Sequence, residues 1–88
     1  MWVVRIEKKC WPELFQKILE GEKNFDVRLA DFKCKRGDTL ILKEWNPKTR
    51  EYTGRVLRKK VAFVLRTKDL KFWADKDIKK YGLQIISF

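Results

Sequence analysis

Residues 21–29 read Gly-Glu-Lys-Asn-Phe-Asp-Val-Arg-Leu, which places a helix-ending glycine directly before an alternating segment. Because side chains of a strand point alternately to its two faces, a strand over 24–29 has one apolar and one polar face. The apolar side chains, expected in a core, are Phe25, Val27 and Leu29. The polar side chains are Asn24, Asp26 and Arg28. With Lys23 at the entrance, the stretch predicts a cation–anion–cation row suited to a polar ligand.

The composition is that of one small globular domain. The chain has 88 residues, of which 44% are hydrophobic and 14% aromatic, so it carries enough apolar side chains for a core and is not of the disordered class. A chain of this size has no room for a second core. We therefore expect a single domain over residues 1–88.

The charge is strongly unbalanced. Lys and Arg total 22 against 12 Asp and Glu, which gives a net charge of +10 with no His to titrate. Such an excess favours polyanionic partners and disfavours cationic ones. Charge alone does not choose between RNA, DNA and an anionic membrane. A second interpretation stays open, since charged, Lys-rich surfaces are also typical of heat-adapted proteins.

Several classes of protein are disfavoured by what the sequence contains. It has no run of about 20 apolar residues that could cross a bilayer, and its first residues are too soon charged for a signal peptide, so a cytoplasmic location is expected. Cys10 and Cys34 lack C-x-x-C spacing and a His partner, so neither a metal site nor thiol catalysis is expected. Two reduced thiols are the simplest interpretation, and a disulfide between them stays open.

Hydrophobic alternation and turn residues predict six short strands and two helices. The strands are expected over 2–7, 24–29, 39–45, 52–57, 61–65 and 83–88. The helices are expected over 12–20, from Pro12 to a stop at Gly21, and over 76–81, with Asp75 as N-cap and Gly82 as stop. The basic run 58–60 interrupts the alternation and predicts a bulge or bend. This order predicts an α+β fold built on a partly closed, mostly antiparallel β-barrel.

The opening stretch also resembles the G-x-K-x-x-E-x-R signature of the ASCH superfamily, whose members adopt a PUA-like β-barrel. Further motifs are similar to a small uncharacterised ASCH-like branch, and the likeness covers nearly the whole chain. They are Pro12-Glu13-Leu14-Phe15, Gly37-Asp38, Glu44-Trp45-Asn46-Pro47 and Tyr52-Thr53-Gly54-Arg55. Two departures stand out: Asp26 replaces the signature Glu, and the chain has no His for imidazole chemistry.

The resemblance implies an RNA-binding role, with RNA or a nucleotide in the cleft between the first helix and the barrel. Lys23 supplies a point charge for phosphate, and Arg28 a planar donor fork for phosphate or a base edge. Asp26 either accepts from an exocyclic amine or holds Arg28 in place, and Asn24 lies beside them. The alternative is that Asp26 and Arg28 form only a structural ion pair.

The expected hairpin adds four candidate RNA-binding residues: Lys43, Trp45, Tyr52 and Arg55. Lys43 and Trp45 share one side of their strand, and the return arm is expected to bring Tyr52 and Arg55 nearby. A base could then stack on an aromatic ring while the cations follow the backbone. Equally, Trp45 and Tyr52 could be cross-strand partners that stabilise the hairpin.

Two other functions stay open. One is a small nucleoside- or RNA-processing enzyme, an amidohydrolase or ribonuclease, because some ASCH relatives have such activities. Of the lysine, threonine and glutamate that the amidohydrolases are thought to use, only Lys23 is matched here. The other is a regulatory domain that binds an acidic protein partner. For the RNA-binding module we expect no cofactor, no metal and a monomer.

Overall fold

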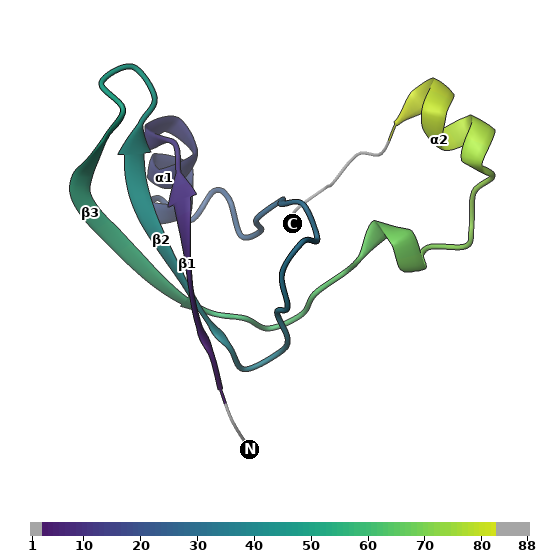
Figure 1. Ribbon diagram of the computed structural model, residues 1–88, viewed down its shortest axis with the longest axis horizontal. Coiled ribbons are helices and arrows are strands. Elements are labelled where there is room, and N and C mark those ends of the chain that lie inside the picture. The colour runs from purple at the N-terminus through teal and green to yellow at the C-terminus, as the bar shows by residue number, and fades with distance from the viewer. Residues whose placement is uncertain (1–2, 83–88) are drawn as a thin grey trace.

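The structure, a computed structural model, describes residues 3–82 and has two parts (Figure 1). A sheet with one helix on its face forms the first part, and an arm that ends in a second helix extends away from it. The elements are β1 (Arg5–Cys10), α1 (Pro12–Leu19), β2 (Thr39–Asn46), β3 (Glu51–Lys60), a 3-10 turn (Thr67–Asp69) and α2 (Asp75–Tyr81). The predicted α+β class is confirmed.

The sheet is three-stranded and mixed, in the order β1-β2-β3. β1 runs parallel to β2, with Cys10 opposite Glu44, and β2 runs antiparallel to β3. Within the described residues the sheet is open, so neither six strands nor a closed barrel is present. The expected first strand is also shifted, because pairing with β2 extends β1 through two lysines to Cys10. Apolar alternation did not predict this end of β1, because its residues are charged.

The core lies between α1 and the adjacent face of the sheet. Its buried members are Cys10, Phe15, Ile18 and Leu42, with Leu40 and Leu57 packed against them. Phe15 and Ile18 are three residues apart on α1, so they share a face of the helix. The helix prediction is confirmed within one residue, and Gly21 ends the segment with a φ of +81° that glycine tolerates.

The predicted strand over 24–29 is wrong. The described backbone there is a loop, and Val27 and Leu29 are 59% and 81% exposed instead of buried. Arg28 donates to the carbonyl oxygen of Lys9, so a side chain and not a backbone ladder ties the loop to β1. Alternation predicted the two faces of this segment but not a neighbouring strand to pair with.

The predicted bend at 58–60 is also wrong. β3 continues to Lys60, which pairs with Thr39. The irregularity lies nearer the hairpin, between the pairs Lys43–Val56 and Trp45–Tyr52, where β3 has more residues than β2. Gly54 allows it, because its φ of +95° suits a bulged strand.

The arm leaves several expected core residues in solvent. Phe63 and Leu65 are 78% and 61% exposed, and residues 61–65 form no strand. The prediction of α2 and of its stop at Gly82 is confirmed, but Tyr81 is 74% exposed and Asp75 provides no side-chain cap. The chain runs away from the sheet after β3, so α2 has no sheet beneath it (Figure 1). The expected strand 83–88 lies outside the described residues.

Candidate nucleic-acid interface

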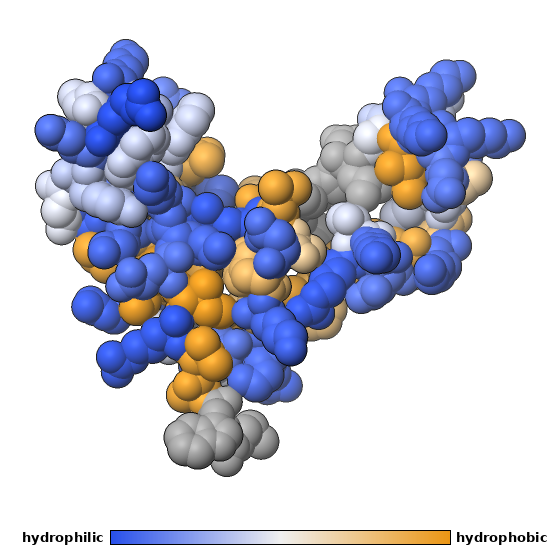
Figure 2. Space-filling view, in the orientation of Figure 1, coloured by the Kyte–Doolittle hydropathy of each residue, from blue (hydrophilic) through white to orange (hydrophobic). Residues whose placement is uncertain are grey.

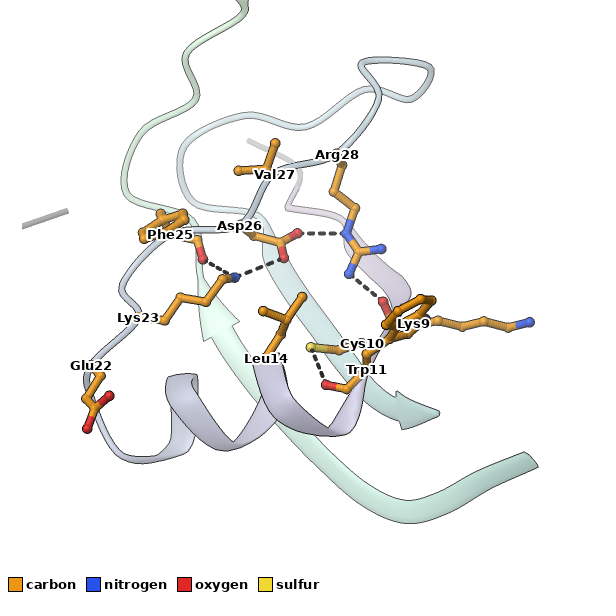
Figure 3. Close-up of a pocket in the computed structure, with 10 residues that line it drawn as sticks. All are labelled: Lys9, Cys10, Trp11, Leu14, Glu22, Lys23, Phe25, Asp26, Val27 and Arg28. Carbon is orange, nitrogen blue, oxygen red and sulfur yellow. Dashed lines mark hydrogen bonds and ion pairs between the residues drawn. The ribbon is translucent and has the colours of Figure 1, made fainter. Parts of the chain in front are cut away.

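A cavity of about 730 Å³ lies where the end of β1, the start of α1 and the loop 22–28 meet (Figure 3). We call it the first cavity. Its lining residues are Lys9, Cys10, Trp11, Leu14, Glu22, Lys23, Phe25, Asp26, Val27 and Arg28. The volume falls in the range of about 300 to 1,000 Å³ that is usual for small-molecule sites.

The predicted polar row forms one wall of the first cavity. Lys23 Nζ donates to the carbonyl oxygen of Phe25 at 2.6 Å and lies 3.7 Å from Asp26 Oδ1. Arg28 Nε donates to Asp26 Oδ2 at 2.7 Å, and its Nη2 donates to the carbonyl oxygen of Lys9 at 2.5 Å. Asp26 therefore stands between two cations (Figure 3). The structural ion pair considered above is present, and it holds both cations at the cavity.

Asn24 lies apart from this row. Its side-chain Nδ2 donates to the carbonyl oxygen of Gly21 at 3.3 Å, and it does not line the first cavity. The amide thus secures the turn that follows α1. The structure therefore does not bring Asn24 together with Asp26 and Arg28 in the wall of the first cavity.

The opposite side of the first cavity is apolar and was not predicted. Trp11 is 58% exposed and Leu14 49% exposed, and both come from the start of α1. Between them and the polar row lies Cys10, a buried thiol whose pKa is raised by burial and by the nearby Asp26 carboxylate. A tryptophan placed directly before the helix-starting Pro12 was the available sequence signal for this apolar wall.

A second cavity of about 390 Å³ adjoins the first. It is lined by Glu7, Lys8, Lys9, Arg28, Lys43 and Tyr52. Lys9 Nζ is 4.4 Å from the ring centre of Trp45 and 5.9 Å from that of Tyr52. Lys43 Nζ is 5.2 Å from the Tyr52 ring and 3.8 Å from Glu7 Oε2. The predicted group of Lys43, Trp45 and Tyr52 is thus brought together, and the two aromatics are also cross-strand partners.

Arg55 is the exception in that predicted group, because it lies on the α1 face of the sheet. Its Nη2 and Nε donate to Glu44 at 2.7 and 3.0 Å, and its guanidinium lies 4.8 Å from the Phe15 ring centre. The Thr53 hydroxyl also donates to Glu44, at 2.5 Å. These hydrogen bonds lower the pKa of Glu44, and the one from Arg55 has the largest effect. The expectation that the return arm brings Arg55 near Lys43 and Trp45 is wrong, because Arg55 lies three residues after Tyr52 on β3 and alternation therefore turns it to the opposite face, toward α1.

Among residues 3–82, no three Cys, Asp or Glu side chains are grouped so that they could hold a metal ion. None of the helices described is both long and apolar enough to cross a bilayer.

The chain belongs to a family described as a domain of unknown function, DUF3850, which matches residues 7–76. A similar protein is the "Uncharacterized 12.9 kDa protein in GpA 3'region" of Escherichia phage P2, which is 36% identical over 69 residues. The match covers 78% of this chain but 59% of the phage protein, so the chain spans less than two thirds of that relative. No solved structure matches the chain. The family match includes every residue that lines the two cavities.

Proposed function

We propose that this chain is a small RNA-binding module of the ASCH superfamily, and that its first cavity receives a nucleotide of the RNA. The observation that carries the proposal is the composition of that cavity. It combines two cationic side chains, Lys23 and Arg28, with the exposed ring of Trp11 opposite them. Cations for phosphate and an aromatic ring for a base are the usual elements of single-strand recognition.

The surroundings of the first cavity favour a polyanion. The chain carries a net charge of +10, and hydrophilic residues cover most of the visible surface of the sheet and of α2 (Figure 2). Contacts with phosphates release counterions, so a basic surface of this kind supports RNA binding with strong salt dependence. An RNA partner and the free thiols of Cys10 and Cys34 favour the cytoplasm as its location.

Two observations favour binding over a lysine-dependent reaction. Lys23 Nζ donates to the carbonyl oxygen of Phe25, so it is engaged as a hydrogen-bond donor. The described residues that line the first cavity include no Ser or Thr, whereas the Thr53 hydroxyl is bonded to Glu44 on the α1 face. The cavity therefore suits the holding of a nucleotide better than the cleavage of one.

We also propose that the complete fold is the PUA-like barrel. The apolar alternation of Val61, Phe63 and Leu65, and the exposure of Phe63 and Leu65, fit a segment that pairs with the edge of the sheet. The amide of Val61 already donates to the carbonyl oxygen of Asp38 in the open sheet, so the test lies in the residues after it. Hydrogen exchange measured by NMR is expected to show slow exchange at alternate amides of 62–65, comparable to those of β3. Fast exchange throughout 62–65, with β3 protected, would contradict the barrel.

Replacing a cation of the polar row is expected to weaken RNA binding. Lys23→Ala and Arg28→Ala should each reduce the affinity for short single-stranded RNA about tenfold or more, because a charge-assisted hydrogen bond to phosphate is lost. Fluorescence anisotropy at fixed salt measures the effect. Lys79→Ala, on α2, removes the same charge away from the cavity and is the matched control.

Circular dichroism establishes whether each variant is folded before its affinity is compared. Arg28→Lys separates charge from geometry, since it keeps the charge and loses the planar donor fork. If both alanine variants bind RNA as the parent does, the first cavity is not the binding site. If heparin competes as well as every RNA, the acidic-partner alternative gains over specific RNA recognition.

A further inference from the structure

The two cavities are neighbours that share two lining residues, Lys9 and Arg28. Lys9 contributes its backbone to the first cavity, while its side chain extends away from it (Figure 3). The ammonium group lies beside Trp45 and Tyr52, where the second cavity opens. The end of β1 thus separates the first cavity on one side from an aromatic surface on the other.

Arg28 lines both cavities and has N–H donors that make no hydrogen bond within the described residues. A guanidinium has five N–H donors. Two of them are used within the described residues, one from Nε to Asp26 and one from Nη2 to the carbonyl oxygen of Lys9. Within the described residues Nη1 makes no hydrogen bond, and the side chain is 26% exposed. Asp26 fixes the orientation of the group, so its remaining donors are presented to an anion at little entropic cost.

The second cavity has the chemistry expected for a second base. Tyr52 is 52% exposed, which leaves ring surface for stacking. The ammonium groups of Lys9 and Lys43 lie 5.9 and 5.2 Å from its ring centre, within reach of the phosphate of a stacked nucleotide. Glu7, the one carboxylate lining this cavity among the described residues, can accept a hydrogen bond from an exocyclic amine.

We infer that the RNA bound by this chain is single-stranded and fills both cavities with consecutive nucleotides. One base enters the first cavity beside Trp11, the next stacks on Tyr52, and Arg28 binds the phosphodiester between them. The inference rests on the proposed function, because it assigns the second cavity to the ligand already proposed for the first. The inferred ligand is therefore a strand of two or more nucleotides and not a single nucleoside.

A duplex cannot make these contacts. Its bases are paired and stacked on one another, so protein side chains reach mainly the backbone and the shallow groove. Duplex RNA is therefore expected to bind through its charge alone, and more weakly than a single strand of equal phosphate number.

The test is a length series titrated at fixed salt. The probes are a ribonucleoside monophosphate, the corresponding dinucleotide and tetranucleotide, and a short duplex. In the parent chain the dinucleotide should bind about 5-fold or more tightly than the mononucleotide, the increment expected from one stacked base. In Tyr52→Ala the ratio of the two affinities should fall toward one, and Tyr52→Phe, which keeps the ring, should restore it.

Charge is controlled separately. Lys43→Ala should reduce the dinucleotide-to-mononucleotide ratio, and Lys79→Ala should not. A mononucleotide that binds as tightly as the tetranucleotide overturns the two-cavity inference but leaves the proposed function standing. Equal affinity for duplex and single strand also overturns the inference. Absence of binding by every RNA overturns both.

Discussion

Phe15→Ala is expected to destabilise the chain by about 3 to 5 kcal/mol, the usual cost of removing a buried phenylalanine from a core. Phe15 is 1% exposed and lies between α1 and the sheet, with the Arg55 guanidinium 4.8 Å from its ring centre. The substitution removes the transfer energy of the ring and leaves a cavity that neighbouring side chains fill incompletely. Small domains have a total stability of about 5 to 15 kcal/mol, so this loss brings the variant close to unfolding.

Urea unfolding followed by tryptophan fluorescence measures this effect. The matched control is Phe72→Ala, because Phe72 is 79% exposed and makes an edge contact with Trp73 alone among the described aromatics. Its expected effect is within about 0.5 kcal/mol, as for other surface substitutions. Equal losses in the two variants would mean that Phe72 is also buried in solution, which favours the closed barrel over the open sheet.

The stability of α1 bears directly on the proposed site. Trp11 and Leu14 form the apolar wall of the first cavity, and both are positioned by the start of α1. RNA binding by Phe15→Ala should therefore decrease in proportion to its folded fraction. In Lys23→Ala, which also removes a hydrogen bond to the Phe25 carbonyl oxygen, RNA affinity should fall by more than the loss of folded protein explains.

The parts of the fold that the sequence predicted have local causes. Pro12 and Gly21 bracket α1, and the Asn46-Pro47 turn joins the two strands of the hairpin. The loop 24–29 has the same alternation as a strand, yet Asp26 and Arg28 satisfy one another and the segment has no ladder partner in the described residues. Alternation describes the two faces of a segment, and it carries no information on whether another strand lies beside it.

The candidate site was predictable only in part, for a related reason. Lys23, Asp26 and Arg28 are close in sequence, so their proximity in the wall of the first cavity needs no long-range pairing. Lys9 and Trp11, at the end of β1 and the start of α1, precede Lys23 by 14 and 12 residues, so only a tertiary contact brings the loop to them. Hydrophobic pattern alone does not show such a contact.

Arg55 and Glu44 provide the clearest electrostatic prediction. Glu44 is 4% exposed and accepts hydrogen bonds from Arg55 and Thr53. These bonds hold the pKa of Glu44 below that of an unfolded chain. In the parent, this carboxylate therefore contributes stability above the unfolded pKa, and the contribution is lost as the pH falls through the lower, folded pKa. Acid should weaken the folded state of the parent in this way.

Arg55→Ala is expected to reverse the sign of that contribution. Without the guanidinium, Glu44 keeps the Thr53 hydroxyl as its partner, and burial raises the pKa of the carboxyl above its unfolded value. Ionisation then opposes folding, so the variant loses stability as the pH rises through the folded pKa. Relative to the parent, its urea midpoint should be much lower near neutral pH and should recover part of the difference near about pH 4.

The double variant Glu44→Gln/Arg55→Ala provides the control for this reversal. It removes the carboxylate, so its urea midpoint relative to Glu44→Gln should show no comparable dependence on pH. A deficit of Arg55→Ala that is the same at both pH values would show that Arg55 stabilises the fold by packing on Phe15 and not by its pairing with Glu44.

At neutral pH the folded fraction of Arg55→Ala should bind RNA as Lys79→Ala does, since the guanidinium lies on the face of the sheet opposite Lys43 and Tyr52. A specific loss of RNA affinity beyond that control would instead extend the binding surface from the first cavity to the pair of Glu44 and Arg55.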